Sequence, residues 1–260
     1  TNATGSAVAI STDAAVIDGG NTAVDIVANN DGAVVTIDAK TGVGSGNALE
    51  TAVAAIDVDN TTSGNIQILE SDAITVLQLD NDTADDGAGA TGSITLDTTD
   101  GTITVEDAGA APAGVGVTAI DGNITLNANG TDSDLVVENV IQTSNPGDNA
   151  VGGVTIALSA DDSVTFTAAG DVTGTGNVTV TVTSNAQTTT TAGNGGDVIF
   201  MADSGTDSAV IDAGSGTITL SAVAAGGGGT AGGSVTLGGL VTTNATGSAV
   251  AISTDAAVID

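Results

Sequence analysis

Short runs in which apolar and small polar residues alternate cover most of this chain. Many share one pattern: Gly, a small polar residue, a β-branched residue, Thr and an aliphatic residue. They occupy residues 92–96, 101–105, 122–126, 176–180, 216–220 and 233–237, with relatives at 64–68 and 153–156. Alternation with a period of two is typical of β-strands with one buried face. In such a strand Ile94 and Leu96 point to one face and Thr95 to the other.

Turn residues separate these runs. Asp-Gly pairs stand at 100–101 and 121–122, an Asn-Gly pair at 129–130 and Asn-Pro-Gly at 145–147. Long runs of helix-forming residues are missing, and 38 glycines are scattered through the chain. The spacing predicts an all-β protein with roughly 18–20 short strands in its first 242 residues.

The two ends of the chain have the same sequence. Residues 1–18 read TNATGSAVAISTDAAVID, and residues 243–260 repeat them without a change. Identity over this length predicts a tandem array, in which residues 1–242 form one repeat unit and 243–260 begin the next. We expect both copies to belong to one continuous solenoid rather than to separate domains, and to occupy equivalent coils.

Small aliphatic side chains supply most of the apolar residues. The chain is 40% hydrophobic, yet it has only two Phe and no Trp or Tyr. This composition favours the narrow core of a parallel β-solenoid over immunoglobulin-like sandwiches, which are anchored by Trp and Tyr. Parallel crossovers are right-handed, so the expected fold is a right-handed β-helix; tandem β-sandwiches are the alternative.

The segment from Gly176 to Ala224, GNVTVTVTSNAQTTTTAGNGGDVIFMADSGTDSAVIDAGSGTITLSAVA, resembles the repeat regions of filamentous-haemagglutinin-type surface proteins. Those regions consist of G-x-[IV]-T-[LV] strands joined by Gly, Asn and Asp turns. The resemblance implies a right-handed parallel β-helix within a giant bacterial surface or fibre protein. The strands of this chain are unevenly spaced, so coils of variable length are expected.

Charge excludes several classes of function. The chain has 32 acidic residues and one basic residue, Lys40, for a net charge of −31. Such a chain repels nucleic acid and anionic membranes, and no apolar run is long enough to be inserted into a bilayer. Without His or Cys it lacks the commonest general base and nucleophile. It also lacks the aromatic platforms and basic residues that β-helical polysaccharide-degrading enzymes carry, so we expect no catalysis.

The densest acidic cluster contains Asp80, Asp82, Asp85 and Asp86 and is followed by Gly87. Oxygen ligands at alternating positions before a glycine are typical of Ca²⁺ loops. Position 84 is Ala and no Glu follows at the twelfth position, so the match to that loop is incomplete. The sequence therefore offers two interpretations, a Ca²⁺ site at these four aspartates and a solvated acidic loop between two coils.

Together these features predict a structural repeat of an extracellular fibre or giant cell-surface adhesin. Its main partner is expected to be a further copy of itself, end to end through repeated coils, with neighbouring fibres or cell surfaces as further partners. Acidity would keep fibres soluble and recruit divalent cations. The alternative is a calcium-dependent adhesin built of tandem β-sandwiches.

Overall fold

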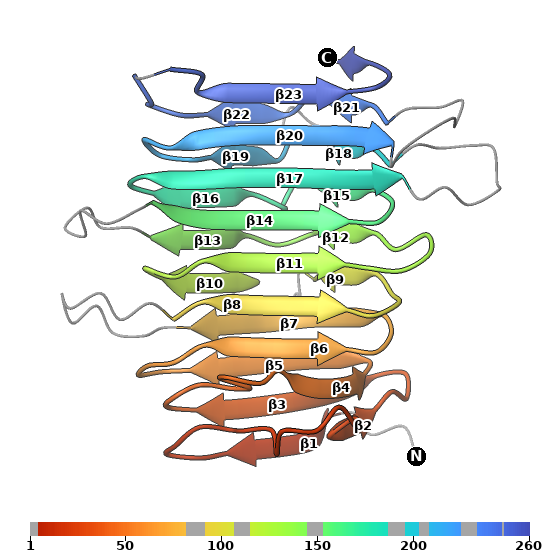
Figure 1. The fold of residues 1–260 in the computed structure, drawn as a ribbon, viewed down its shortest axis with the longest axis vertical. Helices are drawn as coiled ribbons and strands as arrows, with labels where there is room; N and C mark the ends of the chain where they lie inside the picture. The colour runs from red at the N-terminus through yellow and green to blue at the C-terminus, as the bar shows by residue number, and fades with distance from the viewer. Residues whose placement is uncertain are drawn as a thin grey trace.

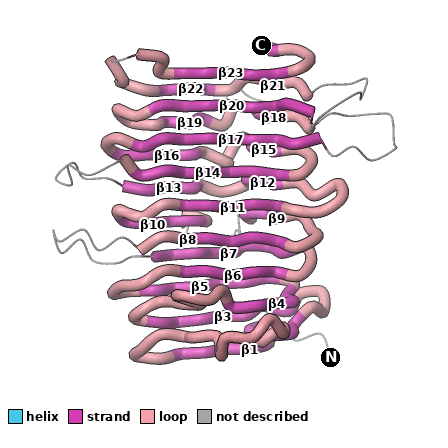
Figure 2. The backbone as a smooth tube through the Cα atoms, in the orientation of Figure 1, coloured by secondary structure: helices cyan, strands magenta, loops and turns pink. Residues whose placement is uncertain are grey.

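A computed structural model describes residues 5–81, 92–106, 115–144, 153–186, 196–202, 208–224, 233–245 and 247–260. Every regular element in these ranges is a β-strand, and the 24 strands stack along one long axis (Figure 1). The chain winds around this axis, and turns at the corners join strands on one side of the stack to strands on the other (Figure 2). None of the described segments forms a helix long and apolar enough to cross a membrane.

One side of the stack is a nine-stranded sheet, here called sheet B. From one end to the other its strands are β2 (Ile26–Ala28), β4 (Leu49–Val53), β6 (Ile66–Glu70), β8 (Ile94–Thr98), β11 (Ile124–Ala128), β14 (Val154–Ala160), β17 (Val178–Ala186), β20 (Thr217–Ala224) and β23 (Val250–Thr254). All neighbours are parallel. Each strand therefore belongs to a successive turn of the chain.

The other side is a fifteen-stranded sheet, sheet A. It begins with four strands, β1 (Gly5–Ser11), β3 (Ala33–Ala39), β5 (Ala55–Asn60) and β7 (Ile74–Asn81). Beyond β7 it continues as two rows of shorter strands. One row is β9 (Ile103–Val105), β12 (Leu135–Val137), β15 (Val164–Phe166), β18 (Val198–Phe200), β21 (Val235–Thr236) and β24 (Val258–Ile259); the other is β10 (Val117–Ile120), β13 (Ile141–Ser144), β16 (Val172–Thr175), β19 (Val210–Asp212) and β22 (Gly239–Val241). The registered pairs of this sheet are also parallel.

Sheet A divides at a bulge in β7. Val76 pairs with Ile56, and the next pair joins Gln78 to Asp57, which leaves Leu77 as an extra residue. The part of β7 before the bulge pairs with β9 and the part after it pairs with β10. A bulge bends a strand and increases its twist locally, so this residue lies where the single row of strands becomes two.

The core consists of columns of aliphatic side chains from successive coils. In sheet B one column has a β-branched residue at each step, and its members are Ile66, Ile94, Ile124, Ile156, Val180 and Ile218. All of them are buried. Ile94 and Leu96 are inaccessible to solvent while Thr95 faces outward, as predicted from the alternation. The prediction of an all-β stack of parallel strands with a solenoid-like core is confirmed, and antiparallel tandem sandwiches do not fit it.

The two aromatic residues of the chain stack on each other. Phe166 of β15 and Phe200 of β18 are register partners, with ring centroids 4.9 Å apart and ring planes inclined by 25°. Both lie in the core. They therefore form one large stack in a core otherwise filled by small aliphatic side chains.

Hydrogen-bond ladders at the corners explain the small polar residue of the sequence pattern. The residue just before a sheet-B strand accepts a bond from the backbone N–H of its counterpart in the next coil: Asn65 from Ser93, Ser93 from Asn123, and Asn123 from Thr155. The same arrangement precedes the β9 row, through Thr102, Asp134, Ser163, Asp197 and Ser234. Each of these hydrogen bonds forms a rung between two coils. It satisfies a backbone N–H that would otherwise need water at the corner.

Inward-facing polar residues also close the corners. Asn60 of β5 is buried and donates to the Oδ1 of Asn81 of β7 at 2.8 Å, while its own Oδ1 accepts from the Gly42 N–H. Thr98 at the end of β8 donates to the Gly101 carbonyl at 2.7 Å. These side chains satisfy backbone groups that turn away from the ladder, so a narrow core can contain polar residues.

The two identical terminal segments lie in different sheets. In the first copy, Val8–Ser11 belong to β1 and pair with β3 in sheet A. Their counterparts in the second copy belong to β23 and pair with β20 in sheet B. The prediction that both copies occupy equivalent coils is therefore wrong for this chain. From β9 onward two strands of sheet A are followed by one strand of sheet B, so β23, which follows β21 and β22, enters sheet B.

Candidate metal-binding site

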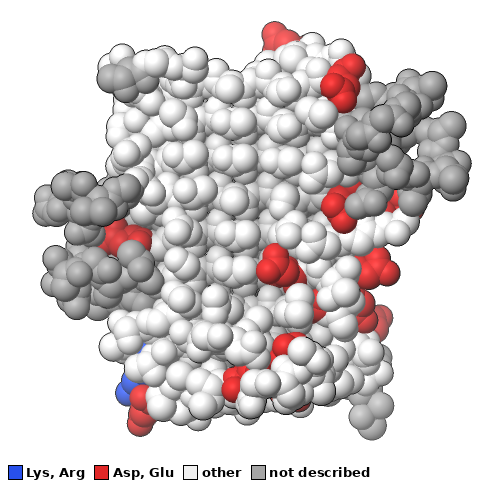
Figure 3. Space-filling view, in the orientation of Figure 1, with Lys and Arg blue, Asp and Glu red and all other residues white. Residues whose placement is uncertain are grey.

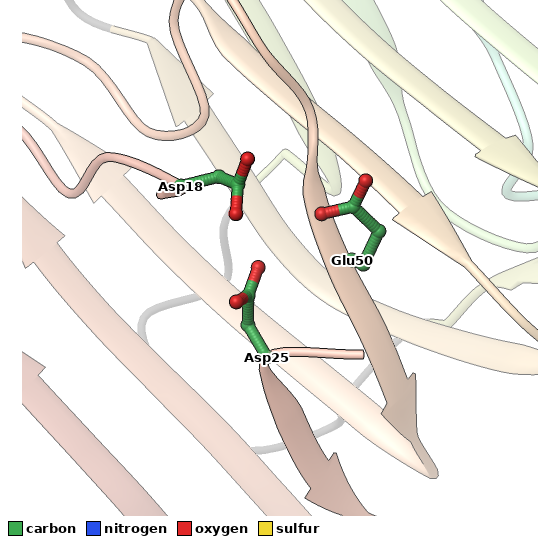
Figure 4. Close-up of side chains that lie close together, drawn as sticks. All are labelled: Asp18, Asp25 and Glu50. Carbon is green, nitrogen blue, oxygen red and sulfur yellow. The ribbon is translucent and has the colours of Figure 1, made fainter. Parts of the chain in front are cut away.

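Three carboxylates converge at the end of the stack that contains the N-terminal coils. Asp18 follows the bridge between Val16 and Val43, Asp25 immediately precedes β2, and Glu50 is the second residue of β4. One oxygen from each lies within 4.8 Å of the others, and Figure 4 shows the three groups turned toward a common space.

Strand pairing positions two of these side chains. Asp25 and Glu50 directly precede Ile26 and Thr51, which are register partners in β2 and β4. The Asp25 N–H donates to the Glu50 carbonyl at 2.8 Å. Side chains of adjacent parallel strands at the same register lie on the same face, so Asp25 and Glu50 belong to neighbouring coils but share one site.

Hydrogen bonds hold Asp18 in place. Its Oδ2 accepts from the Gly20 N–H at 2.6 Å and from the Nδ2 of Asn47, which lies in the segment between Val43 and β4. Its Oδ1 is buried and makes no hydrogen bond to any of the described residues. One oxygen thus fixes the loop, and the other keeps its capacity to bind a ligand.

Glu50 is the most buried member of the cluster. The residue is 8% exposed, and its Oε2 has no hydrogen-bond partner within the described part of the chain. A buried charged oxygen without a partner is costly, so this group needs either a proton or a cation.

Electrostatics across the cluster show the same need. Burial raises the pKa of Glu50, and the negative charge of Asp18 raises it further. The hydrogen bond from Asn47 lowers the pKa of Asp18 in spite of its partial burial. Lys40 is the only basic residue of the chain, and its Nζ lies 2.6 Å from Asp13 Oδ1 in an ion pair. No other side chain can neutralise the cluster with a positive charge.

Glu70 at the end of β6 provides a contrast. It is fully buried, and burial raises its pKa. Its carboxylate nevertheless accepts hydrogen bonds from the Thr51 hydroxyl at 2.7 Å and from the N–H groups of Val53 and Ser71 at 3.1 and 2.9 Å. Glu70 therefore closes a corner, and its acceptor capacity is used within the protein.

The four aspartates singled out in the sequence are only partly described. Asp80 lies in strand β7 rather than in a loop, and its Oδ2 accepts from Gln78 Nε2 at 3.4 Å. Asp82, Asp85 and Asp86 lie outside the described residues. A Ca²⁺ site at these four residues thus stays a prediction.

Asp80 extends an acidic column on the outer face of sheet A. Strand register aligns Asp38 of β3 with Asp59 of β5 and Asp59 with Asp80 of β7. Desolvation and the charges of Asp38 and Asp59 raise the pKa of neighbouring Asp57. Burial and three nearby aspartates likewise raise the pKa of Asp162. Stacking at about 4.8 Å places like charges well within the screening length.

These shifts predict that the fold becomes less stable as the pH rises. Because the pKa values of Asp57 and Asp162 are higher in the native than in the unfolded chain, the native state binds more protons above about pH 4, and its free energy of unfolding falls until these groups are ionised. The pKa values of Asp13 and Asp18 are lowered by hydrogen bonds from Lys40 and Asn47. Their opposing effect acts below about pH 4, where these carboxylates become protonated first in the unfolded chain.

The measurement is the urea midpoint, monitored by circular dichroism at constant ionic strength between about pH 4 and pH 7. The midpoint is expected to fall, and the fall should be shallower in Asp57→Asn than in the exposed control Asp31→Asn. A midpoint that rises with pH would contradict this expectation.

Sequence reasoning missed Asp18, Asp25 and Glu50. They are separated by 7 and 25 residues and form no local motif. The available signal is Glu50 itself, a charged residue within the strand Leu49–Val53 in which every residue is buried. Identifying its partners requires the length of the coil, since Asp25 precedes Glu50 by one turn of the chain.

No family model, no curated protein and no solved structure matches this chain. Its function is therefore inferred from its own sequence and geometry.

Proposed function

We propose that this chain is a structural segment of an extracellular fibre or giant cell-surface adhesin, built as a right-handed parallel β-helix and without catalytic activity. The observation that carries the proposal is a stack of parallel strands combined with an exact sequence repeat at a distance of 242 residues. A repeat whose coils stack by backbone pairing extends in one dimension, and each added copy lengthens the rod.

The ends of the stack support self-association. β2 and β23 are the outermost strands of sheet B, and each is paired on one side within the chain. An edge strand presents unpaired N–H and C=O groups to any strand that can pair with it. A further copy of the repeat is the partner that such an edge fits, in keeping with coils that continue from one copy to the next.

The outer face of sheet B supports lateral contacts between rods. The outward residues of β11, β14, β17 and β20 are Thr, Ser, Asn, Ala and Val, with no carboxylate. Figure 3 shows this face as largely uncharged, with acidic side chains mainly toward its edges and both ends. A flat uncharged face allows close approach, while the acidic borders limit uncontrolled association.

The length of tandem arrays tests the architecture. Residues 1–242 contribute all the strands of sheet B except β23. These eight strands, spaced by about 4.8 Å, predict that one repeat advances by about 38 Å. Chains with one, two and three copies of residues 1–242 should appear in electron micrographs as rods of constant width, each copy adding about 38 Å. Separate beads, or a step beyond about 80 Å, would contradict a continuous solenoid.

Surface labelling tests the location. An antibody raised against the folded chain should label intact source cells or the fibres they release. Labelling that requires permeabilised cells would contradict an extracellular role, whatever the shape of the tandem arrays.

A further inference from the structure

The geometry points to a Ca²⁺ site formed by Asp18, Asp25 and Glu50, which joins the N-terminal coil to the one that follows it. Two independent observations carry this inference. One is the convergence of three carboxylate oxygens within 4.8 Å of one another. The other is Glu50, a residue only 8% exposed, whose Oε2 has no hydrogen-bond partner among the described residues. Its carboxylate is turned toward this space (Figure 4).

The distances suit calcium. Ca²⁺ binds oxygen at about 2.3–2.6 Å, so two of its ligands stand up to about 5 Å apart. The oxygens of this cluster fall within that limit. Mg²⁺ dehydrates reluctantly and is usually bound through only one or two carboxylates and several waters, so a site of three carboxylates suits Ca²⁺ better. Three carboxylates also supply a charge and a hardness that favour Ca²⁺ over softer metals.

A bound cation would balance the negative charge of the cluster. With Lys40 engaged by Asp13, the cluster has no positive partner within the chain. A bound divalent ion would neutralise most of the charge of the three groups and satisfy the Oε2 of Glu50. It would also restrain β2, a strand of three residues whose central Val27 is 65% exposed. The site thus strengthens the docking of a weakly buried coil.

Calorimetric titration of the whole chain with CaCl₂, after removal of metal by a chelator, tests the site. The parent is expected to bind Ca²⁺, and Glu50→Gln should weaken binding at least tenfold. The matched control, Asp38→Asn with Asp59→Asn, removes charge from the outer column of sheet A and should keep the parent affinity. Equal binding by the parent and Glu50→Gln, or no binding by the parent, would overturn the proposal.

Two further titrations distinguish this site from calcium binding elsewhere on the chain and from a site for Mg²⁺. The triple variant Asp82→Asn, Asp85→Asn, Asp86→Asn should bind like the parent; if it loses binding while Glu50→Gln keeps it, calcium belongs to the other acidic segment and the proposal fails. MgCl₂ should bind at least tenfold more weakly than CaCl₂ in the parent. Equal affinities would overturn the assignment to calcium.

Stability measurements distinguish loss of the calcium site in Glu50→Gln from misfolding of the variant. In chelator, the urea midpoint of Glu50→Gln should equal or exceed that of the parent, because one of three repelling carboxylates is gone. At matched ionic strength, added Ca²⁺ should raise the midpoint of the parent and leave that of Glu50→Gln unchanged. An equal rise in both would show that calcium acts diffusely on the acidic surface, and would overturn the site. These outcomes do not depend on whether the chain forms rods.

Discussion

Replacing Gly216 by Ala is expected to destabilise the fold by about 3 kcal/mol, because the coils touch at this point through their backbones. A Cβ on Gly216 would stand 1.8 Å from the carbonyl oxygen of Val178 in the preceding coil. No side-chain rotation relieves a clash with a backbone atom, so β20 must move away from β17. Gly122, whose Cβ would stand 2.0 Å from the Gly92 carbonyl oxygen, should behave in the same way.

The change is measured as the shift in urea midpoint, with Gly19→Ala as the control. Gly19 has nothing closer than 3.9 Å to its added Cβ, so its replacement should change stability by no more than about 0.5 kcal/mol. Equal effects at Gly216 and Gly19 would show that the coils can separate without cost. Close approach would then not explain the glycine of the sequence pattern.

Phe166→Ala is expected to cost about 3–5 kcal/mol, since it removes a fully buried ring and leaves a cavity between coils. Phe166 stacks on Phe200 and pairs in register with Val137 on its other side. The surrounding side chains are held by backbone ladders on both sides, so the site has little freedom to collapse. Loss of the stacked pair adds to the loss of buried area.

Thr165→Ala is the matched control for this variant, because Thr165 lies beside Phe166 in β15 and faces outward. By urea unfolding, the free energy of unfolding of Thr165→Ala should lie within about 1 kcal/mol of that of the parent. It should be well above that of Phe166→Ala. Comparable losses for the two variants would indicate that the strand itself, rather than the aromatic stack, limits stability at this coil.

Much of the fold follows from local chemistry. The alternation around Ile94, Thr95 and Leu96 predicts which side chains are buried, since the period of two holds wherever one face of a strand is covered. The small polar residues of the pattern proved to be rungs between coils, as with Asn65 and Ser93. Their role could not be predicted from the sequence, because it depends on which residue of the next coil lies opposite.

The candidate site was beyond sequence reasoning for the same reason. Asp80 and its neighbours attracted attention because they are close together in the chain, yet Asp80 lies in a strand with its register partner Asp59 beside it. Asp18, Asp25 and Glu50 are brought together by coil length and by the pairing of β2 with β4. Coil lengths vary in this protein, so spacing along the chain does not reveal which acidic residues share a face.

Three properties follow from the order of the residues alone: the chain is all-β, its core is narrow and aliphatic, and residues 1–18 recur at 243–260. The place of each strand, in contrast, depends on how the coils stack. The identical segments show this directly, since Ile10 lies in sheet A and its counterpart Ile252 in sheet B. Both positions pack against the core, because either sheet accepts an alternating strand of small apolar residues. The choice depends on the neighbouring strands, whose backbone groups pair without regard to side-chain identity.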